Sequence, residues 1–229
     1  MILSDPEWQA VLLSLKVSGI AVAGSLPFGI LMAWILVRCR FPGKALLDSL
    51  IHLPLVLPPV VVGYLLLIGL GRRGIIGEKL YDWFGFSFAF SWRGAALASA
   101  VIAFPLMVRA IRLALEAVDI RLEQAARTLG AGRWRVFFTI TLPLTLPGVI
   151  AGTVLAFARS LGEFGATITF VSNIPGETRT IPLAMYSLIE TPGAEGAAAR
   201  LCVIAIVLAL ASLLASEWLA RLGRKRMGA

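Results

Sequence analysis

The side chains that could carry out chemistry in this chain are few. Among 229 residues there are 13 acidic residues, two cysteines and one histidine. A site built from several histidines is therefore excluded, because His52 is the only one, and Cys39 and Cys202 form no CxxC pattern. No HExxH or G-x-S-x-G occurs, and the one Gly-Lys pair, at 43–44, lacks the rest of a P-loop. We expect no bound cofactor, no metal and no hydrolytic centre in this chain.

The composition is that of an integral membrane protein. Hydrophobic residues make up 59% of the chain and charged residues 15%, with a mean hydropathy of +0.88, whereas soluble domains have roughly a quarter of their residues charged. The net charge of +8 does not indicate nucleic-acid binding, because the basic residues lie between apolar segments and not along one polar face. Anionic lipid headgroups and the positive-inside rule explain that charge better.

Five apolar segments are long enough to cross the hydrocarbon core, which takes about 20 helical residues. The second is interrupted by Pro54, Pro58 and Pro59, so we expect a distorted or broken span packed inside the bundle. Segment 164–190 is richer in hydroxyls, and a sixth membrane-inserted segment there is left open. The chain is predicted to be a single all-α polytopic membrane domain, residues 1–229. The five segments are 17–37, 46–70, 94–115, 140–158 and 201–220.

Basic residues follow the first, third and last of these segments. Most of the 21 Lys and Arg residues lie in 38–44, 109–135 and 221–226. The positive-inside rule then places the N-terminus outside and the C-terminus inside. Asp5 and Glu7 stand where a signal peptide would carry basic residues, so the first segment is expected to be retained.

Small residues recur every four positions in the fourth segment. Gly148, Gly152, Ala156 and Ser160 would form one stripe on a helix, which permits close contact with another helix. The stripe could serve packing within the chain or an interface between subunits.

Residues 122–147 are polar and basic between long apolar segments. Ala125 and Ala126 would let a helix approach a partner closely, while Gly130 and Gly132 would allow left-handed backbone angles at a helix end. Pro143 stands where a new helix can begin. We expect a short helix, a turn and a second helix outside the bilayer, available to a partner.

This spacing resembles the EAA loop of bacterial ABC importer membrane subunits, EAA-x3-G-x9-I-x-LP. The usual Glu of that family falls on Gln124, with Glu123 one residue earlier. The resemblance implies that the loop, about 116–139, forms a coupling helix that docks into a groove on an ATPase subunit. The residues it assigns to this coupling loop are Glu123, Gln124, Ala125, Ala126, Gly130 and Gly132.

Two further stretches extend the resemblance over nearly the whole chain. LPLVLPPVVVGYLLL (53–67) and ARSLGEFGATITFVSNIPGETRTIPLAMY (158–186) resemble molybdate permease subunits of type I ABC importers. The resemblance implies five, or with 164–190 six, transmembrane helices in the bacterial inner membrane. It also implies a homodimer, a periplasmic oxyanion-binding protein and two ATPase copies that carry ATP and Mg. Molybdate, with tungstate, is the expected cargo, and this subunit is not an enzyme. Sulfate permeases have less closely matching versions, so sulfate or another oxyanion is the alternative.

Seven residues are candidates for the translocation pathway or its gate. An oxyanion pathway requires hydroxyls, backbone N–H groups or helix N-termini, without strong negative charge. The prolines could line the route or only kink a packing helix, and hydroxyls often bond their own backbone. Arg159 and Glu163 lie one turn apart, which favours a structural ion pair over charges that line the route. The candidates are Pro58, Pro59, Ser160, Glu163, Thr167, Thr169 and Ser172.

Two functions of other classes compete with this interpretation. A gradient-driven secondary transporter predicts internal repeats and ionisable residues within the membrane, but no repeat is seen and the charges lie mostly near the ends of spans. An intramembrane enzyme or a scaffold needs a catalytic constellation or a large partner surface, and only the loop suggests a partner. An ATP-driven importer remains the leading prediction.

Overall fold

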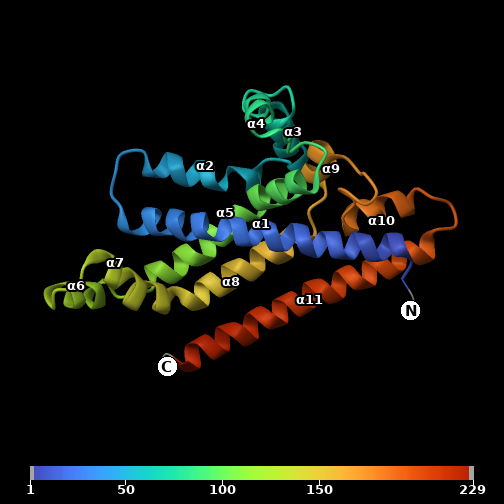
Figure 1. Cartoon of the computed structure of the whole chain (residues 1–229). Helices are drawn as coiled ribbons and strands as arrows, with labels where there is room; N and C mark the ends of the chain where they lie inside the picture. Colours follow the sequence, from blue (N-terminus) through green and yellow to red (C-terminus); the bar gives the residue numbers. More distant parts are fainter. Residues whose placement is uncertain (1–2, 227–229) are drawn as a thin grey trace.

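The computed structural model describes residues 3–226, and within them the regular structure is entirely helical (Figure 1). The side chains of 216 and 219–226 are outside the description. The elements are α1 (Asp5–Arg38), α2 (Lys44–Val56), α3 (Pro59–Leu70), α4 (Gly77–Phe84), α5 (Trp92–Glu116), α6 (Ile120–Thr128), α7 (Arg133–Val136), the π-helix η1 (Phe137–Thr141), α8 (Leu142–Leu161), α9 (Gly165–Val171), α10 (Ile181–Ile189) and α11 (Glu195–Arg226).

Four helices in the described part of the chain are long and apolar enough to cross a membrane. They are α1, α5, the continuous run Arg133–Leu161 and Glu195–Ala215 of α11. The pair α2 and α3 passes the same test together, and counting this bent pair as one span gives the predicted five. Segment 164–190 supplies only α9 and α10, of seven and nine residues, which are too short to cross.

The second span is broken at the prolines, as predicted. α2 and α3 meet at an angle of 113°, because Pro58 and Pro59 offer no backbone N–H and push Leu57 into an extended conformation, with ψ 141°. The prediction that the whole segment packs inside the bundle is wrong for α2, which has no buried side chain. Its Leu46 is 65% exposed and its Val56 82%. In Figure 1, α3 and α4 project from the bundle beyond α2.

The core of the bundle forms around α5, which packs against α1 and α8. The small-residue stripe of α8 faces α5. A Cβ on Gly148 would lie 2.1 Å from the Cβ of Ala114, and one on Gly152 would lie 3.0 Å from the carbonyl oxygen of Met107. Ala156 is fully buried. Of the two interpretations of the stripe, packing within the chain is therefore confirmed, since larger side chains would force the helices apart.

Candidate functional site

The predicted coupling loop forms one compact segment, residues 119–141, at the left-hand end of the molecule in Figure 1. α6 begins at the cap residue Asp119, whose Oδ1 accepts a hydrogen bond from the backbone N–H of Arg121 at 2.9 Å. It ends in a Schellman motif, in which Ala131 N–H donates to Ala126 C=O and Gly130 N–H to Arg127 C=O, both at 3.0 Å. This helix and its termination match the predicted helix and turn.

The two glycines of the loop differ in backbone conformation. Gly130 has φ +83°, the left-handed conformation that the Schellman motif requires. Gly132 has φ −66° and ψ 161° and caps α7 in an extended conformation that any residue adopts. The left-handed conformation predicted for Gly132 is wrong.

The second predicted helix is not separate from the fourth span. α7, η1 and α8 form one continuous helical run from Arg133 to Leu161. Pro143 lies in the first turn of α8, as predicted, but the preceding turn is already helical, as η1. A movement of the loop would therefore be transmitted directly into the α8 span.

Glu123 is the residue that fastens this loop to the bundle. The residue is 5% exposed, and Oε1 accepts hydrogen bonds from Arg38 Nη2 at 2.7 Å and from Thr141 Oγ1 at 3.0 Å. We call Glu123, Arg38 and Thr141 the Glu123 network. It joins α6 to the end of α1 and to η1 by charge-assisted hydrogen bonds. The carboxylate therefore holds the loop in place and faces away from any partner of α6.

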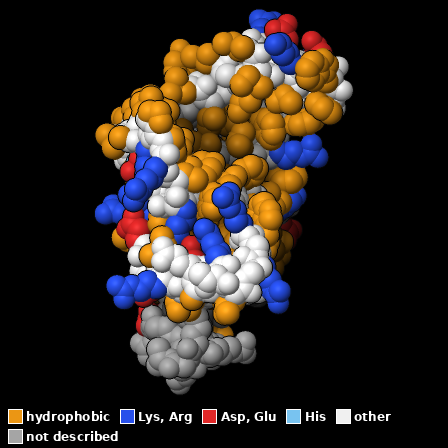
Figure 2. Space-filling model, turned by 90° about the vertical axis from the view of Figure 1, so that its left-hand side faces the viewer, with side chains coloured by type: hydrophobic (Ala, Val, Ile, Leu, Met, Phe, Trp, Pro, Cys, Tyr) orange, Lys and Arg blue, Asp and Glu red, His pale blue; other side chains and the backbone are white. Residues whose placement is uncertain are grey.

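The exposed surface of the loop combines apolar and basic side chains. Gln124 and Ala125 are exposed and Ala126 is half-buried, while Leu129 is 88% exposed and Trp134 77%. Figure 2 views this end and shows Lys and Arg side chains among hydrophobic ones. An exposed apolar patch with a basic surround is typical of a protein or membrane contact. Four arginines of this loop form no ion pair with any described residue: Arg121, Arg127, Arg133 and Arg135.

Two of the predicted pathway residues, Pro59 and Thr169, lie at a second place, where α3 meets α9. We call it the α3–α9 junction. A Cβ on Gly165 would lie 2.8 Å from a ring carbon of Pro59. One on Gly63 would lie 2.5 Å from the carbonyl oxygen of Ala166 and 3.0 Å from the Cβ of Thr169. The structure thus brings Pro59 together with the α9 segment, about a hundred residues later in the chain.

Glu163 organises this junction locally. It is 2% exposed; Oε2 pairs with Arg159 Nη1 at 2.7 Å, and Oε1 accepts a hydrogen bond from Ala166 N–H at 2.8 Å. The carboxylate therefore caps the first turn of α9 and neutralises the arginine. The favoured structural interpretation of the Arg159–Glu163 pair agrees with this geometry.

The hydroxyls of the junction mostly bond to their own backbone. Thr167 Oγ1 donates to Phe164 C=O at 2.8 Å and Thr169 Oγ1 to Gly165 C=O at 2.9 Å. Ser172 has φ +62°, and its carbonyl accepts a bond from Thr178 Oγ1. Ser160 differs, because its buried Oγ has no hydrogen-bond partner in the described part of the chain. It is the hydroxyl most available for another contact.

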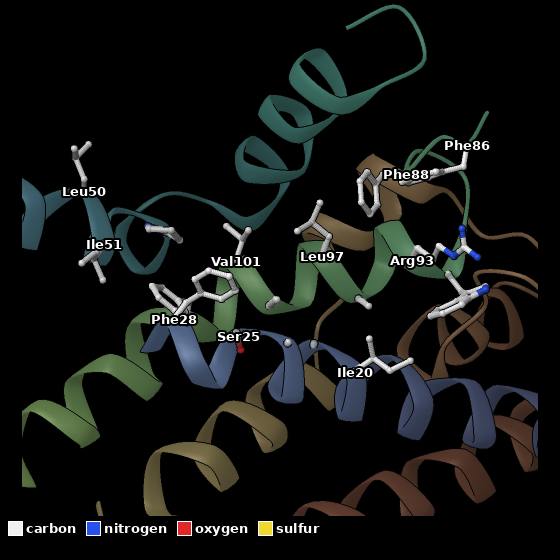
Figure 3. A pocket seen from close by; sticks show the side chains of 17 residues that line it. Ile20, Ser25, Phe28, Leu50, Ile51, Phe86, Phe88, Arg93, Leu97 and Val101 are labelled. Atoms are coloured by element: carbon white, nitrogen blue, oxygen red, sulfur yellow. The ribbon is translucent and has the colours of Figure 1, made fainter. Parts of the chain in front are cut away.

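A cavity of about 760 Å³ lies between α1, α2 and α5 (Figure 3). Its lining is almost entirely apolar, with Arg93 as the one charged residue. None of the seven predicted pathway residues lines it. Labelled lining residues in Figure 3 include Ile20, Ser25 and Phe28 of α1, Leu50 and Ile51 of α2, and Leu97 and Val101 of α5. Within the described residues, no group of three or more His, Cys, Asp and Glu side chains could hold a metal ion.

Arg38 and Thr141 are absent from the residues that the sequence predicts for the coupling loop. Arg38 precedes Glu123 by 85 residues and Thr141 follows it by 18. The sequence indicates for Arg38 only a basic residue at the end of the first span, where the positive-inside rule uses it to orient the chain. No local pattern connects these positions, so only the packing of α1 against the loop reveals the network.

Comparisons with known proteins agree with this architecture. The family model of binding-protein-dependent transport system inner membrane components matches residues 25–227. The molybdenum transport system permease protein ModB of Escherichia coli (strain K12) is 81% identical over 228 residues, 100% of both chains. The sulfate transport system permease protein CysT of the same strain is 39% identical over 201 residues, 88% of this chain and 72% of that one.

A solved structure has the same fold. It is a bacterial alginate ABC transporter in complex with an alginate-pentasaccharide-bound periplasmic protein, with a TM-score of 0.75 and 20% identity over 95% of this chain and 79% of the other. With the family model covering most of its length, this multi-pass chain belongs to the family of binding-protein-dependent transport system inner membrane components.

Proposed function

We propose that this chain is the membrane-spanning permease subunit of an ATP-driven importer that moves molybdate, and tungstate with it, across the bacterial inner membrane. The observation that carries the proposal is the full-length 81% identity to a molybdenum transport permease. The exposed α6, fastened to two membrane-spanning helices by the Glu123 network, supports the same conclusion. The chain is a transport subunit; ATP and Mg²⁺ belong to a partner ATPase.

The coupling step follows from how α6 is held. The exposed face of α6, with Gln124, Ala125 and Leu129, docks on the ATPase. When two ATPase subunits close on ATP, α6 moves as a rigid body. Because the Glu123 network ties α6 to α1 and η1, this movement reaches two spans at once and shifts the bundle between two packings.

The proposed assembly contains two copies of this single-domain chain, two ATPase copies and a periplasmic oxyanion-binding protein. The exposed apolar surface of α2, including Leu46 and Leu50, supports a second copy as its cover. Arg38, Arg40 and Lys44 flank the coupling end of the bundle. The positive-inside rule places that end and the C-terminus in the cytoplasm and the N-terminus in the periplasm.

The pathway is proposed to pass the α3–α9 junction, where Pro59 and Thr169 lie at the contact between the two helices. Pro58, Glu163 and Thr167 are next to these contacts in the sequence. Ser160 and Ser172 lie on the segments that flank the junction. The small number of free hydroxyls here is appropriate for a pore that conducts an oxyanion, since a site that binds an ion tightly also releases it slowly. Tight recognition then belongs to the binding protein.

Uptake of labelled molybdate tests the cargo directly. Cells that lack this chain and are supplied with it should regain uptake, and tungstate should compete while sulfate should not. Sulfate is the second candidate because the sulfate permease of Escherichia coli is 39% identical. Rescue of sulfate uptake alone would keep the importer and change its cargo. If neither molybdate nor sulfate uptake is restored while the ATPase and the binding protein are present, the proposed importer function is contradicted.

A matched pair of glycine variants tests the coupling role. Gly130 and Gly193 have φ of +83° and +81°, and both would place a Cβ in open space. Gly130→Glu should therefore cost about the same backbone strain as Gly193→Glu, about 1 to 2 kcal/mol. Only the first variant alters the α6 docking surface. We expect it to abolish uptake and to release the ATPase on co-purification, while Gly193→Glu retains both. Equal behaviour of the two variants would contradict docking through α6.

A further inference from the structure

A separate cavity of about 430 Å³ lies between α1 and the start of the Arg133–Leu161 helix. We call it the α1–α7 cavity. It is distinct from the cavity in Figure 3, with which it shares no lining residue. Its lining is Pro27, Ile30, Leu31 and Trp34 of α1 with Arg133, Trp134 and Phe137 of α7 and η1.

The lining combines an apolar body with one cation. Arg133 is the one charged lining residue, and it forms no ion pair with another described residue. Trp34 and Trp134 are aromatics of the kind that mark the level of lipid headgroups. Basic pockets between spans on the cytoplasmic side bind anionic headgroups. A ligand with a phosphate and a long apolar chain would satisfy both parts of the lining.

The length of the cavity suits one lipid acyl chain. From Pro27 to Trp34 the α1 wall extends seven residues, or about 10 Å at the helical rise. That is a large part of one leaflet, which is about 15 Å of hydrocarbon. One acyl chain of that leaflet can therefore lie along the α1 wall of the cavity.

The cavity also borders the coupling segment. Phe137 is the first residue of η1, and π-turns within helices concentrate at functional sites. The same π-helix ends at Thr141, which donates to Glu123. An occupant of the cavity would therefore contact the element that links α6 to α8.

We propose that the α1–α7 cavity binds an anionic phospholipid of the cytoplasmic leaflet, with its phosphate on Arg133 and one acyl chain against Ile30 and Leu31. This site is additional to the transport function and does not depend on the cargo. The lipid fills the space beside η1 and holds the coupling segment against α1.

The test uses the purified complex of this chain with its ATPase in nanodiscs of phosphatidylcholine with phosphatidylglycerol. Native mass spectrometry measures the phosphatidylglycerol that stays bound after release from the disc. Arg133→Gln should lower retention about tenfold, because one charge-assisted bond is lost. Arg135→Gln is the matched control, since Arg135 is also exposed and without an ion pair but does not line the cavity. Arg133→Lys should retain most of the binding. Equal retention in Arg133→Gln and Arg135→Gln would overturn the proposal.

Photo-crosslinking identifies the occupant independently of affinity. A benzophenone amino acid in place of Leu31, a half-exposed lining residue, should give an adduct with the mass of a phospholipid. A crosslink to a second copy of the chain or to the ATPase would assign the cavity to a protein contact and overturn the proposal. Both experiments measure lipid binding and not transport. A negative result therefore contradicts the lipid site without contradicting the transport function, and a failure of uptake does not contradict the lipid site.

Discussion

Two buried glutamates lie at the two candidate functional regions of this molecule, and they connect the chain in opposite ways. Glu123 and Glu163 are 5% and 2% exposed, and each accepts a bond from an arginine at 2.7 Å. The partners of Glu123 come from α1 and η1, 85 and 18 residues away. Those of Glu163 are Arg159, four residues before it, and the N–H of Ala166, three residues after. Glu123 joins separate elements, whereas Glu163 shapes one corner of the chain.

The two arginines also differ in their surroundings, so breaking the two ion pairs should cost different amounts of free energy. The Arg38 side chain is 15% exposed and its Nε is buried without a partner, while the Arg159 side chain is 31% exposed. If Glu163 is removed, water can therefore partly solvate Arg159. If Glu123 is removed, water reaches Arg38 less well. Breaking a buried pair from one side costs more than breaking a solvated one, because a buried charge is left alone.

The largest effect is expected for Glu123→Ala. It leaves Arg38 as a buried cation and removes the acceptor of Thr141, so it should lower the free energy of unfolding by about 3 kcal/mol. Uptake should be lost as well, because α6 is no longer tied to α1 and η1. Thermal unfolding of the detergent-solubilised complex and labelled uptake measure the two effects.

The matched control is Glu116→Ala. Glu116 lies at the end of α5 and pairs with Arg112 at 2.8 Å, but its side chain is 45% exposed. Exposed pairs contribute little to stability, so this variant should stay close to the wild type. If Glu123→Ala were no more harmful than Glu116→Ala, the Glu123 network would not couple the loop to the bundle.

Glu163→Ala should have the second-largest effect and lower the free energy of unfolding by about 2 kcal/mol. It removes the cap on α9 and leaves Arg159, which is partly exposed, without its partner. Glu163→Gln separates the two contributions, since an amide oxygen can still accept from Ala166 N–H. We expect Gln to recover roughly half of the loss and to retain ATPase binding. Loss of ATPase binding in either variant would mean that the junction, too, belongs to the coupling machinery.

The same contrast explains what the sequence could predict. The Arg159–Glu163 pair, the break at the 58–59 prolines and the turn at Gly130 follow from spacing within a few residues, and the structure has all three. The Glu123 network depends on where α1 ends relative to a loop 85 residues later, and no local propensity encodes that distance. The exposure of α2 escaped prediction for a related reason. Its apolar sequence indicates burial without saying whether its own chain, lipid or a second copy provides the cover.

The smallest effect, and the finest test of the comparison, comes from two buried threonines one turn apart. Thr141 and Thr145 are 2% and 1% exposed. Thr141 Oγ1 donates across to Glu123 at 3.0 Å, whereas Thr145 Oγ1 donates to the carbonyl of Thr141 in its own helix at 2.9 Å. Thr141→Val should cost about 1 kcal/mol, because the carboxylate loses one donor. Thr145→Val should be nearly neutral, because a hydroxyl bonded back to its own helix adds little stability.

Thermal unfolding of Thr141→Val and Thr145→Val, each in the detergent-solubilised complex, measures this difference in stability. Arg38 still holds Glu123 in Thr141→Val, so uptake should fall only a fewfold, and a double variant with Glu123→Ala should cost no more than Glu123→Ala alone. Equal losses in the two valine variants would mean that Thr141 stabilises η1 as a helix residue only. The tie between α6 and α8 would then depend on Arg38 alone, through α1.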